Sequence, residues 1–209
     1  MVTYKRGSRG EVVKQIQKAL NLYPDGIFGE LTEERVRLFQ ADNGLKVDGV
    51  VGPATLAKLL GKVAANAIKL KKSRRRIDEI IIHCTATPEG RECTVNEIRL
   101  WHKARGFSDI GYHYLVHLNG DVDLGRDVDI SGAHCTGHNA HSIGVCYVGG
   151  CGKDGKTPKD TRTQEQKAAL ANLLMDLRKL YPWAKIRGHR DFANKACPSF
   201  DATAEYRRF

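Results

Sequence analysis

The sequence predicts an α/β protein with a mixed central sheet and flanking helices, preceded by a small three-helix module. A 23-residue repeat lies within the first 60 residues, and the chain beyond residue 77 alternates short β-branched runs with helical patterns. Hydrophobic residues make up 41% and charged residues 28% of the 209 residues, as in globular proteins. We therefore expect a helical module over 1–60, a basic linker over 61–76 and an α/β domain over 77–209.

The N-terminal module is predicted from two copies of one turn. Segments 25–29 (DGIFG) and 48–52 (DGVVG) stand 23 residues apart, and each is followed by a threonine, Thr32 or Thr55. A D-G pair favours a tight turn, and threonine is suited to start a helix. A capping-box pattern at 8–11 (SRGE) predicts one further helix upstream. Three short helices around a shared core are the expected result.

Most of the excess positive charge lies in one short segment. Residues 61–76 contain seven basic and no acidic side chains, whereas 1–60 contain nine and seven, and 77–209 contain 18 and 17. Like charges repel each other and stay solvated, which predicts a flexible tether. The run could also hold an anionic polymer without specificity. The near-neutral flanking domains argue against a specific nucleic-acid-binding protein.

The α/β domain is predicted from hydrophobic runs and helix-start signals. The β-branched run 77–83 (IDEIIIH) indicates a strand buried on both faces. Capping boxes at 94–97 and 163–166 start two helices, which are expected to end before Gly106 and Pro182. The expected remaining strands are 112–118 and 121–124, joined by an N-G turn, then 143–148 and 185–187.

Two histidines and one cysteine are candidate metal ligands. His83 ends a predicted buried strand, His189 follows the last predicted strand, and Cys197 comes eight residues later. Imidazole and thiolate ligands suit Zn²⁺ better than Mg²⁺ or Ca²⁺. Three such ligands would leave a fourth position open for water, as in catalytic zinc sites.

A rival histidine and cysteine group lies in one glycine-rich loop. It consists of His134, Cys135 and His138, with His141 nearby, and its ligands are crowded close together along the chain. No two of the six cysteines are spaced C-x-x-C, so a zinc ribbon or a thioredoxin-like motif finds no support. We expect free thiols that are mostly buried.

Six segments of the α/β domain form a characteristic series. They are 81–87 (IIHCTAT), 97–102 (EIRLWH), 111–114 (GYHY), 132–134 (GAH), 139–146 (NAHSIGVC) and 195–201 (KACPSFD). In this order they resemble the zinc-dependent N-acetylmuramoyl-L-alanine amidases of the type 2 group, especially the T7-lysozyme-like phage endolysins. The same fold serves the peptidoglycan recognition proteins. The N-terminal repeat, with its F-Q-x-x-x-G-L segment at 39–45, resembles the peptidoglycan-binding type 1 domain.

The resemblance implies a role for individual residues. The implied roles are zinc ligand for His83, His189 and Cys197, assistance to catalysis for Tyr112, a place beside the substrate carbonyl for Lys195, and substrate contact for His134 and Asn139. The implied reaction is hydrolysis, by zinc-activated water, of the amide between the lactyl group of N-acetylmuramic acid and L-alanine. The implied cofactor is Zn²⁺, and the implied partner is bacterial peptidoglycan.

A non-catalytic peptidoglycan recognition protein is the alternative. Recognition proteins that have lost activity commonly carry serine in place of the cysteine ligand, so Cys197 favours an enzyme. We expect a monomer with no membrane span and no specific nucleic-acid partner. The first residues have no apolar run typical of a signal peptide, so we expect synthesis in the bacterial cytoplasm and action on the wall after release through a holin or lysis.

Overall fold

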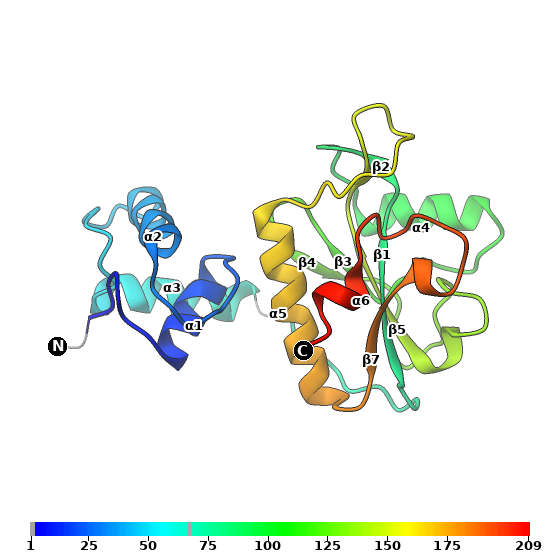
Figure 1. Cartoon of the computed structure of the whole chain (residues 1–209), viewed down its shortest axis with the longest axis horizontal. Helices are drawn as coiled ribbons and strands as arrows, with labels where there is room; N and C mark the ends of the chain where they lie inside the picture. Colours follow the sequence, from blue (N-terminus) through cyan, green and yellow to red (C-terminus); the bar gives the residue numbers. More distant parts are fainter. Residues whose placement is uncertain (1–2, 67) are drawn as a thin grey trace. The chain divides into compact units, whose positions relative to one another are not determined.

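The computed structural model describes residues 3–66 and 68–209, and the side chains of 60–66 also lie outside the description. The chain divides into two compact units, Met1–Ala67 and Ile68–Phe209. The first is a helical module and the second an α/β domain, which confirms the predicted fold class (Figure 1). Within the described residues, no helix combines the length and apolar character needed to cross a membrane.

The first unit contains three helices around one small hydrophobic core. These are α1 (Glu11–Ala19), α2 (Glu30–Asp42) and α3 (Pro53–Asn66). Helix α1 buries Val13 and Ile16, and α2 buries Val36 and Phe39 in the same cluster. The apolar positions recur at helical spacing, and burying them offsets the entropy lost on ordering the chain. The predicted three-helix module is therefore confirmed.

The threonines of the repeat do not cap helices, contrary to the prediction. Helix α2 begins after Gly29, and Thr32 is buried inside its first turn. The Oγ1 of Thr32 accepts a hydrogen bond from the Gln17 side-chain amide at 3.2 Å. That amide also donates to Asp25 Oδ1 at 2.7 Å, and its oxygen accepts from the Gly26 N–H at 2.9 Å. One buried glutamine thus joins a helix, the D-G turn and the next helix.

The second copy of the repeat is built in the same way around Gln40. Its amide donates to Asp48 Oδ1 at 3.0 Å and to Thr55 Oγ1 at 3.3 Å, and its oxygen accepts from the Gly49 N–H at 2.9 Å. Gln17 and Gln40 are also 23 residues apart, so the repeat includes a residue type that the turn pattern did not indicate. Buried polar groups require partners, and each glutamine satisfies a turn that would otherwise lack them.

The predicted capping box at 8–11 is also wrong. Helix α1 begins at Glu11 after Gly10, and no side chain caps its first turn. The Ser8 hydroxyl instead accepts the backbone N–H of Lys5 at 3.0 Å. Gly10 has φ of 114°, a backbone conformation that glycine adopts readily and that sets the entry to the helix.

Gln17→Met should destabilise the first unit by roughly 2–4 kcal/mol, because the turn groups stay buried without their partner. Hydrogen exchange of the full chain, followed by mass spectrometry, should show faster exchange in peptides from 3–66 and unchanged exchange in peptides from 68–209. Gln15→Met is the matched control, because Gln15 is exposed on the same helix. Equal exchange in the two variants would contradict the role of the buried glutamine.

The second unit contains a five-stranded sheet in the order β4-β3-β5-β1-β7. Strand β1 pairs in parallel with both β5 and β7, β3 pairs in parallel with β5, and only β4 is antiparallel to its neighbour. The strands are β1 (Glu79–Cys84), β3 (Tyr114–Val116), β4 (Val122–Leu124), β5 (Ser142–Tyr147) and β7 (Lys185–Gly188). The mixed sheet and the predicted hairpin are therefore confirmed, with shorter hairpin strands than expected.

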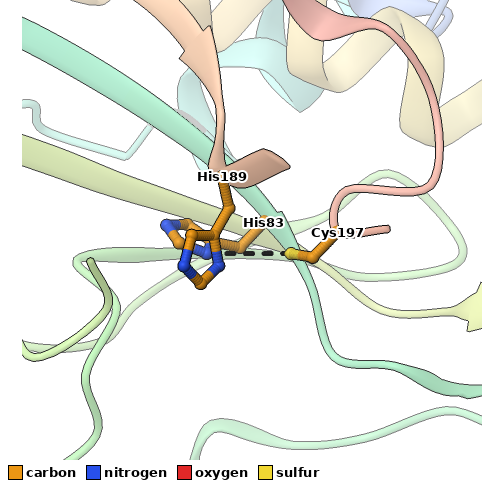
Figure 2. A group of neighbouring side chains, drawn as sticks. All are labelled: His83, His189 and Cys197. Atoms are coloured by element: carbon orange, nitrogen blue, oxygen red, sulfur yellow. Dashed lines mark hydrogen bonds between the residues drawn. The ribbon is translucent and has the colours of Figure 1, made fainter. Parts of the chain in front are cut away.

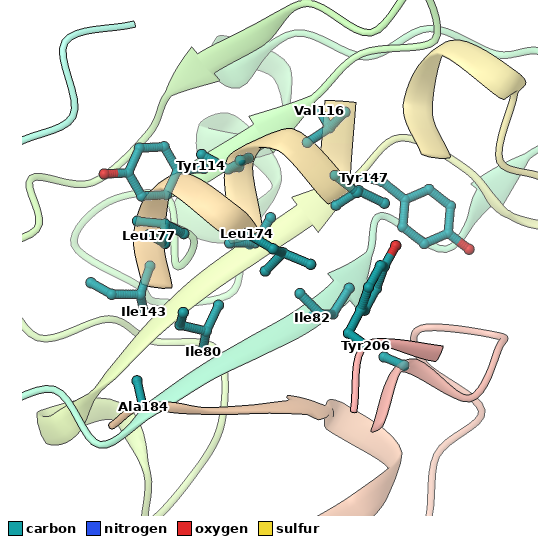
Figure 3. Packing of buried hydrophobic residues seen from close by; sticks show 14 of the residues in the cluster. Ile80, Ile82, Tyr114, Val116, Ile143, Tyr147, Leu174, Leu177, Ala184 and Tyr206 are labelled. Carbon is teal, nitrogen blue, oxygen red and sulfur yellow. The ribbon is translucent and has the colours of Figure 1, made fainter. Parts of the chain in front are cut away.

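Two helices pack against the sheet. Helix α5 (Gln164–Leu180) places Leu174 and Leu177 in one hydrophobic cluster with Ile80 and Ile82 of β1 (Figure 3). Helix α4 (Val95–Ala104) contributes Ile98 to a separate cluster. Both helices begin with the predicted capping boxes, at Thr94 and Thr163. Successive residues of β1 point to opposite faces, so His83 lies on the face opposite Ile80 and Ile82.

Five short elements were not predicted. They lie in the connections between the main strands and helices and at the end of the chain. These are β2 (Thr87–Pro88), which pairs in parallel with β6 (Gly150–Cys151), the 3₁₀ turns η1 (Asn139–His141) and η2 (His189–Asp191), and α6 (Ala202–Glu205). All six cysteines are free, as expected.

The basic run is not a solvated tether over its described residues, which corrects the linker predicted over 61–76. Helix α3 extends to Asn66, residue 67 lies outside the described residues, and 68–76 belong to the second unit. Lys71 Nζ lies 2.6 Å from a carboxylate oxygen of Asp129, and Arg74 Nε lies 3.0 Å from the same atom. The Lys71 ammonium and the Arg74 N–H lower the pKa of Asp129 to about 2. Opposite charges from the sheet domain therefore hold this segment.

Candidate active site

Three predicted ligands from separate segments meet at the carboxyl end of the sheet. His83 is near the end of β1, His189 directly follows β7, and Cys197 lies in the loop after η2. Their side chains point toward one another (Figure 2). The Arg190 N–H donates to the Cys197 carbonyl oxygen at 2.7 Å, which ties the cysteine loop to η2. The parallel pairing of β1 and β7 brings the two histidines to the same edge.

The donor atoms have a spacing that fits a metal ion. Cys197 Sγ lies 3.8 Å from His83 Nδ1, and one donor atom from each residue lies within 4.8 Å of the others. Tetrahedral zinc with Zn–S of about 2.3 Å and Zn–N of about 2.0 Å would separate sulfur and nitrogen by about 3.5 Å. The residues present therefore fit Zn²⁺ as a ligand set of two imidazoles and one thiolate.

The charge state of the histidines also suits metal binding. Burial, with smaller contributions from His134 and His189, places the pKa of His83 well below its usual value. Burial likewise lowers the pKa of His189. Contact with the Cys84 thiol, followed by burial, raises the pKa of Cys197, while the Cys84 N–H donates to its sulfur at 3.3 Å. The imidazoles are neutral ligands, and a cation would offset the cost of a buried thiolate.

A chain of hydrogen bonds fixes the tautomer of His83. The Ser142 hydroxyl donates to the His138 carbonyl oxygen at 2.7 Å, so its oxygen is left to accept from His134 Nε2–H at 3.4 Å. His134 Nδ1 then accepts from His83 Nε2–H at 3.0 Å. The lone pair of His83 Nδ1 is consequently directed to Cys197. Such contacts behind a ligand orient its ring and set which nitrogen binds the metal.

The chain leaves space for His134 by placing glycine beside it. A Cβ on Gly144 of β5 would lie 2.6 Å from the His134 ring. The Asn139 side-chain oxygen accepts the backbone N–H groups of His134 and Cys135 at 2.8 and 2.9 Å. In the structure, His134 and Asn139 are therefore engaged with the protein itself, behind the metal ligand. Their contact with substrate, which the resemblance implied, stays a prediction.

The two predicted catalytic residues, Tyr112 and Lys195, differ in their exposure to solvent. The Tyr112 ring is 5.1 Å from the His83 ring between centroids, and burial raises the pKa of Tyr112 well above its usual value. The Lys195 side chain is exposed, and its charge contributes to the lowered pKa values of His83 and His189. The protein thus brings a protonated phenol and an ammonium group into the neighbourhood of the ligands.

The rival group in the glycine-rich loop does not assemble as one site among the described residues. His134 contacts His83, whereas His138 and His141 lie close to Glu79. The sequence did not indicate Glu79 as part of this group. Other histidines support the backbone: His113 Nδ1 accepts the Gly144 N–H at 2.9 Å. The parallel register of β1 and β5, rather than spacing along the loop, decides which histidines meet.

A mixed sheet carries at its carboxyl edge two histidines and one cysteine whose donor atoms are spaced as in a metal site. The chain belongs to the N-acetylmuramoyl-L-alanine amidase family, whose family model matches residues 73–200. A family model for a peptidoglycan binding domain matches residues 9–59. The protein is therefore a peptidoglycan hydrolase that also carries a domain of the peptidoglycan-binding family, as the sequence predicted.

Individual relatives agree with this assignment. The endolysin of Enterobacteria phage K11 is 44% identical over 128 residues, which are 61% of this chain and 84% of that protein. The endolysin of Escherichia phage T7 is 44% identical over 130 residues, or 62% and 85% of the two chains.

Solved structures show the same fold. The N-acetylmuramoyl-L-alanine amidase LysC from Clostridium intestinale is 25% identical, with a TM-score of 0.52, over 66% of this chain and 91% of that chain. An ectodomain complex of the peptidoglycan recognition proteins LCa and LCx, bound to tracheal cytotoxin, matches with 27% identity and a TM-score of 0.54. That match covers 70% of this chain and 93% of the solved chain.

Proposed function

We propose that this amidase is zinc-dependent and acts as a phage or prophage endolysin. The observation that carries the zinc assignment is the convergence of His83, His189 and Cys197, with the Nδ1 lone pair of His83 directed to the cysteine. The enzyme hydrolyses the amide between the lactyl group of N-acetylmuramic acid and L-alanine. The non-catalytic alternative is disfavoured because all three ligand residues are present.

The chain's own groups would divide the work around the metal. Bound Zn²⁺ supplies a Lewis acid and acidifies water at the site. Tyr112 keeps its proton because burial raises its pKa, so its hydroxyl orients the attacking water or the carbonyl by donating a hydrogen bond. Lys195 places positive charge where the tetrahedral intermediate becomes negative. His134 positions His83 through its hydrogen bond, and we retain contact with substrate for His134 and Asn139 as part of this proposal.

The endolysin role follows from the relatives and from the two units. Phage endolysins match the amidase unit at 44% identity, and the first unit matches a peptidoglycan binding domain. A module that holds an insoluble polymer raises the local concentration of the amidase on it. We propose that the protein reaches the wall after release from the cytoplasm, through a holin or by lysis, and that it works as a monomer.

Cys197→Ser and His83→Ala should each remove the tightly bound zinc and reduce release of L-alanine-linked peptides from purified sacculi to the level without enzyme. Loss of one ligand from three leaves too few donors for a stable site. Metal analysis and mass spectrometry of the digests give the two readouts. Cys151→Ser is the matched control, because Cys151 is likewise a free thiol but lies outside the ligand group. Full activity in a ligand variant would end the zinc assignment.

His134→Ala should weaken zinc binding by about 10–100-fold, because His83 loses the partner that fixes its tautomer. The zinc dissociation constant, measured by competition with a chelator, is the readout. His134→Gln retains an acceptor for His83 Nε2–H and should recover part of the affinity. An unchanged dissociation constant in His134→Ala would instead show that the contact has no influence on the ligand.

Residues 1–67 should sediment with purified sacculi at low salt. The isolated 68–209 unit should sediment less than the full chain, because it lacks the polymer-binding module. Gln17→Met in the 1–67 fragment is the control for folding, and it should reduce the sedimented fraction along with the structure. If the 1–67 fragment stays in the supernatant while circular dichroism shows it folded, the binding role of the first unit is wrong.

A further inference from the structure

We propose that Glu79, His138 and His141 form a second transition-metal site, separate from the His83, His189 and Cys197 group. One donor atom from each of the three residues lies within 4.8 Å of the others, as in the first site. The donor set is two imidazoles and one carboxylate, a combination that binds zinc in other proteins. The amidase reaction does not use these residues.

The local backbone explains why the two histidines meet. His138 precedes η1, and His141 is the last residue of that 3₁₀ turn. Residues i and i+3 of a 3₁₀ turn lie on the same side, because the turn has three residues per repeat. The two rings accordingly stand 6.1 Å apart between centroids. A histidine pair at this spacing presents its nitrogens to one side of the loop.

Strand pairing brings the carboxylate to the same place. Glu79 opens β1 and lies opposite Ser142 of β5, the residue that follows His141. The Asp78 N–H donates to the His141 carbonyl oxygen at 2.8 Å, which continues the pairing by one residue. The Glu79 carboxylate therefore sits beside the histidine turn through the sheet register, and this juxtaposition does not depend on the loop alone.

The three side chains are held and partly shielded from water. His138 Nδ1 and Glu79 Oε2 are 2.7 Å apart, and the two side chains are 31% and 16% exposed. The Phe192 ring packs on the His138 ring at 4.0 Å between centroids, which fixes the ring plane. The Glu79 carboxylate and the His138 imidazole, which are already oriented, therefore lose little freedom on binding a cation.

The Glu79–His138 hydrogen bond could by itself fasten the loop to β1. That interpretation accounts for Glu79 and His138 but gives His141 no role. A metal ion uses all three donors, with water completing its coordination. Imidazole favours Zn²⁺, Ni²⁺ or Cu²⁺ over Mg²⁺ and Ca²⁺, so the site should select transition metals.

The experiment measures zinc uptake by the full chain in equilibrium dialysis. Wild type should bind two equivalents of Zn²⁺, Cys197→Ser one, and His138→Gln with His141→Gln one. An excess of Mg²⁺ should displace none of the bound Zn²⁺. His117→Gln is the matched control, because His117 also contacts two carboxylates, Glu92 and Asp123, but belongs to neither group. It should still bind two equivalents.

Cobalt distinguishes failure of this proposal from failure of the amidase assignment. Co²⁺ in the first site has a sulfur ligand and should show a thiolate charge-transfer band, which Cys197→Ser removes. The second site offers only nitrogen and oxygen donors, so Co²⁺ bound there should not increase the intensity of the charge-transfer band. A wild-type uptake of one equivalent that shows the band, or a second equivalent that persists in the double histidine variant, would overturn the second site while leaving the first intact.

Discussion

The placement of β1 between two parallel partners is the constraint on which the active site depends. Ile82 pairs with Gly188 of β7, and the next residue along the chain in each case is a predicted ligand, His83 or His189. On the other side, His83 itself pairs with Cys146 of β5. A one-residue slip in either register would turn a ligand to the opposite face of the sheet. The hydrophobic residues that alternate with His83 on β1 specify the register, because they must face α5.

A second layer of contacts fixes what the register cannot, namely the orientation of the rings. His134 reaches His83 only because Gly144 has no side chain, and Asn139 holds the backbone on which His134 sits. Arg75 donates to the carbonyl oxygens of Asn139 and Ala140, both at 3.0 Å. Arg75, near the start of the second unit, thus fastens the loop that carries His134, and His134 in turn orients His83. Burial makes the largest contribution to the lowered pKa of Arg75, which is consistent with a structural position.

The sequence predicts best those features that are set by neighbouring residues. The capping boxes at Thr94 and Thr163, the hairpin and the buried strand were all anticipated, because each has a local physical cause. The three candidate ligands could be proposed because His83 ends a predicted strand and His189 directly follows another. Their assembly, however, rested on a family resemblance, since spacing alone did not exclude the rival loop group.

Several errors of sequence reasoning share one cause, which is that a partner far along the chain decides the outcome. Thr32 has the residue type of a helix cap, but its hydroxyl accepts a buried hydrogen bond from the Gln17 side-chain amide instead. Glu79 looked like an ordinary strand residue, and only the register with β5 brings it to His138 and His141. No local pattern distinguishes these cases, because the competing interactions form only when the core packs.

The basic segment shows how such a partner changes a functional interpretation. Seven positive charges without a compensating acid indicated a solvated chain or a site for an anionic polymer. In the structure, Lys71 and Arg74 pair with Asp129, Arg76 pairs with Asp78, and Ile68 and Leu70 pack against the hydrophobic core. Charge that is already paired releases fewer counterions from a polymer and adds less to its binding. The described residues 68–76 therefore act chiefly as part of the second unit, where Arg75 fastens the loop at Asn139 and Ala140.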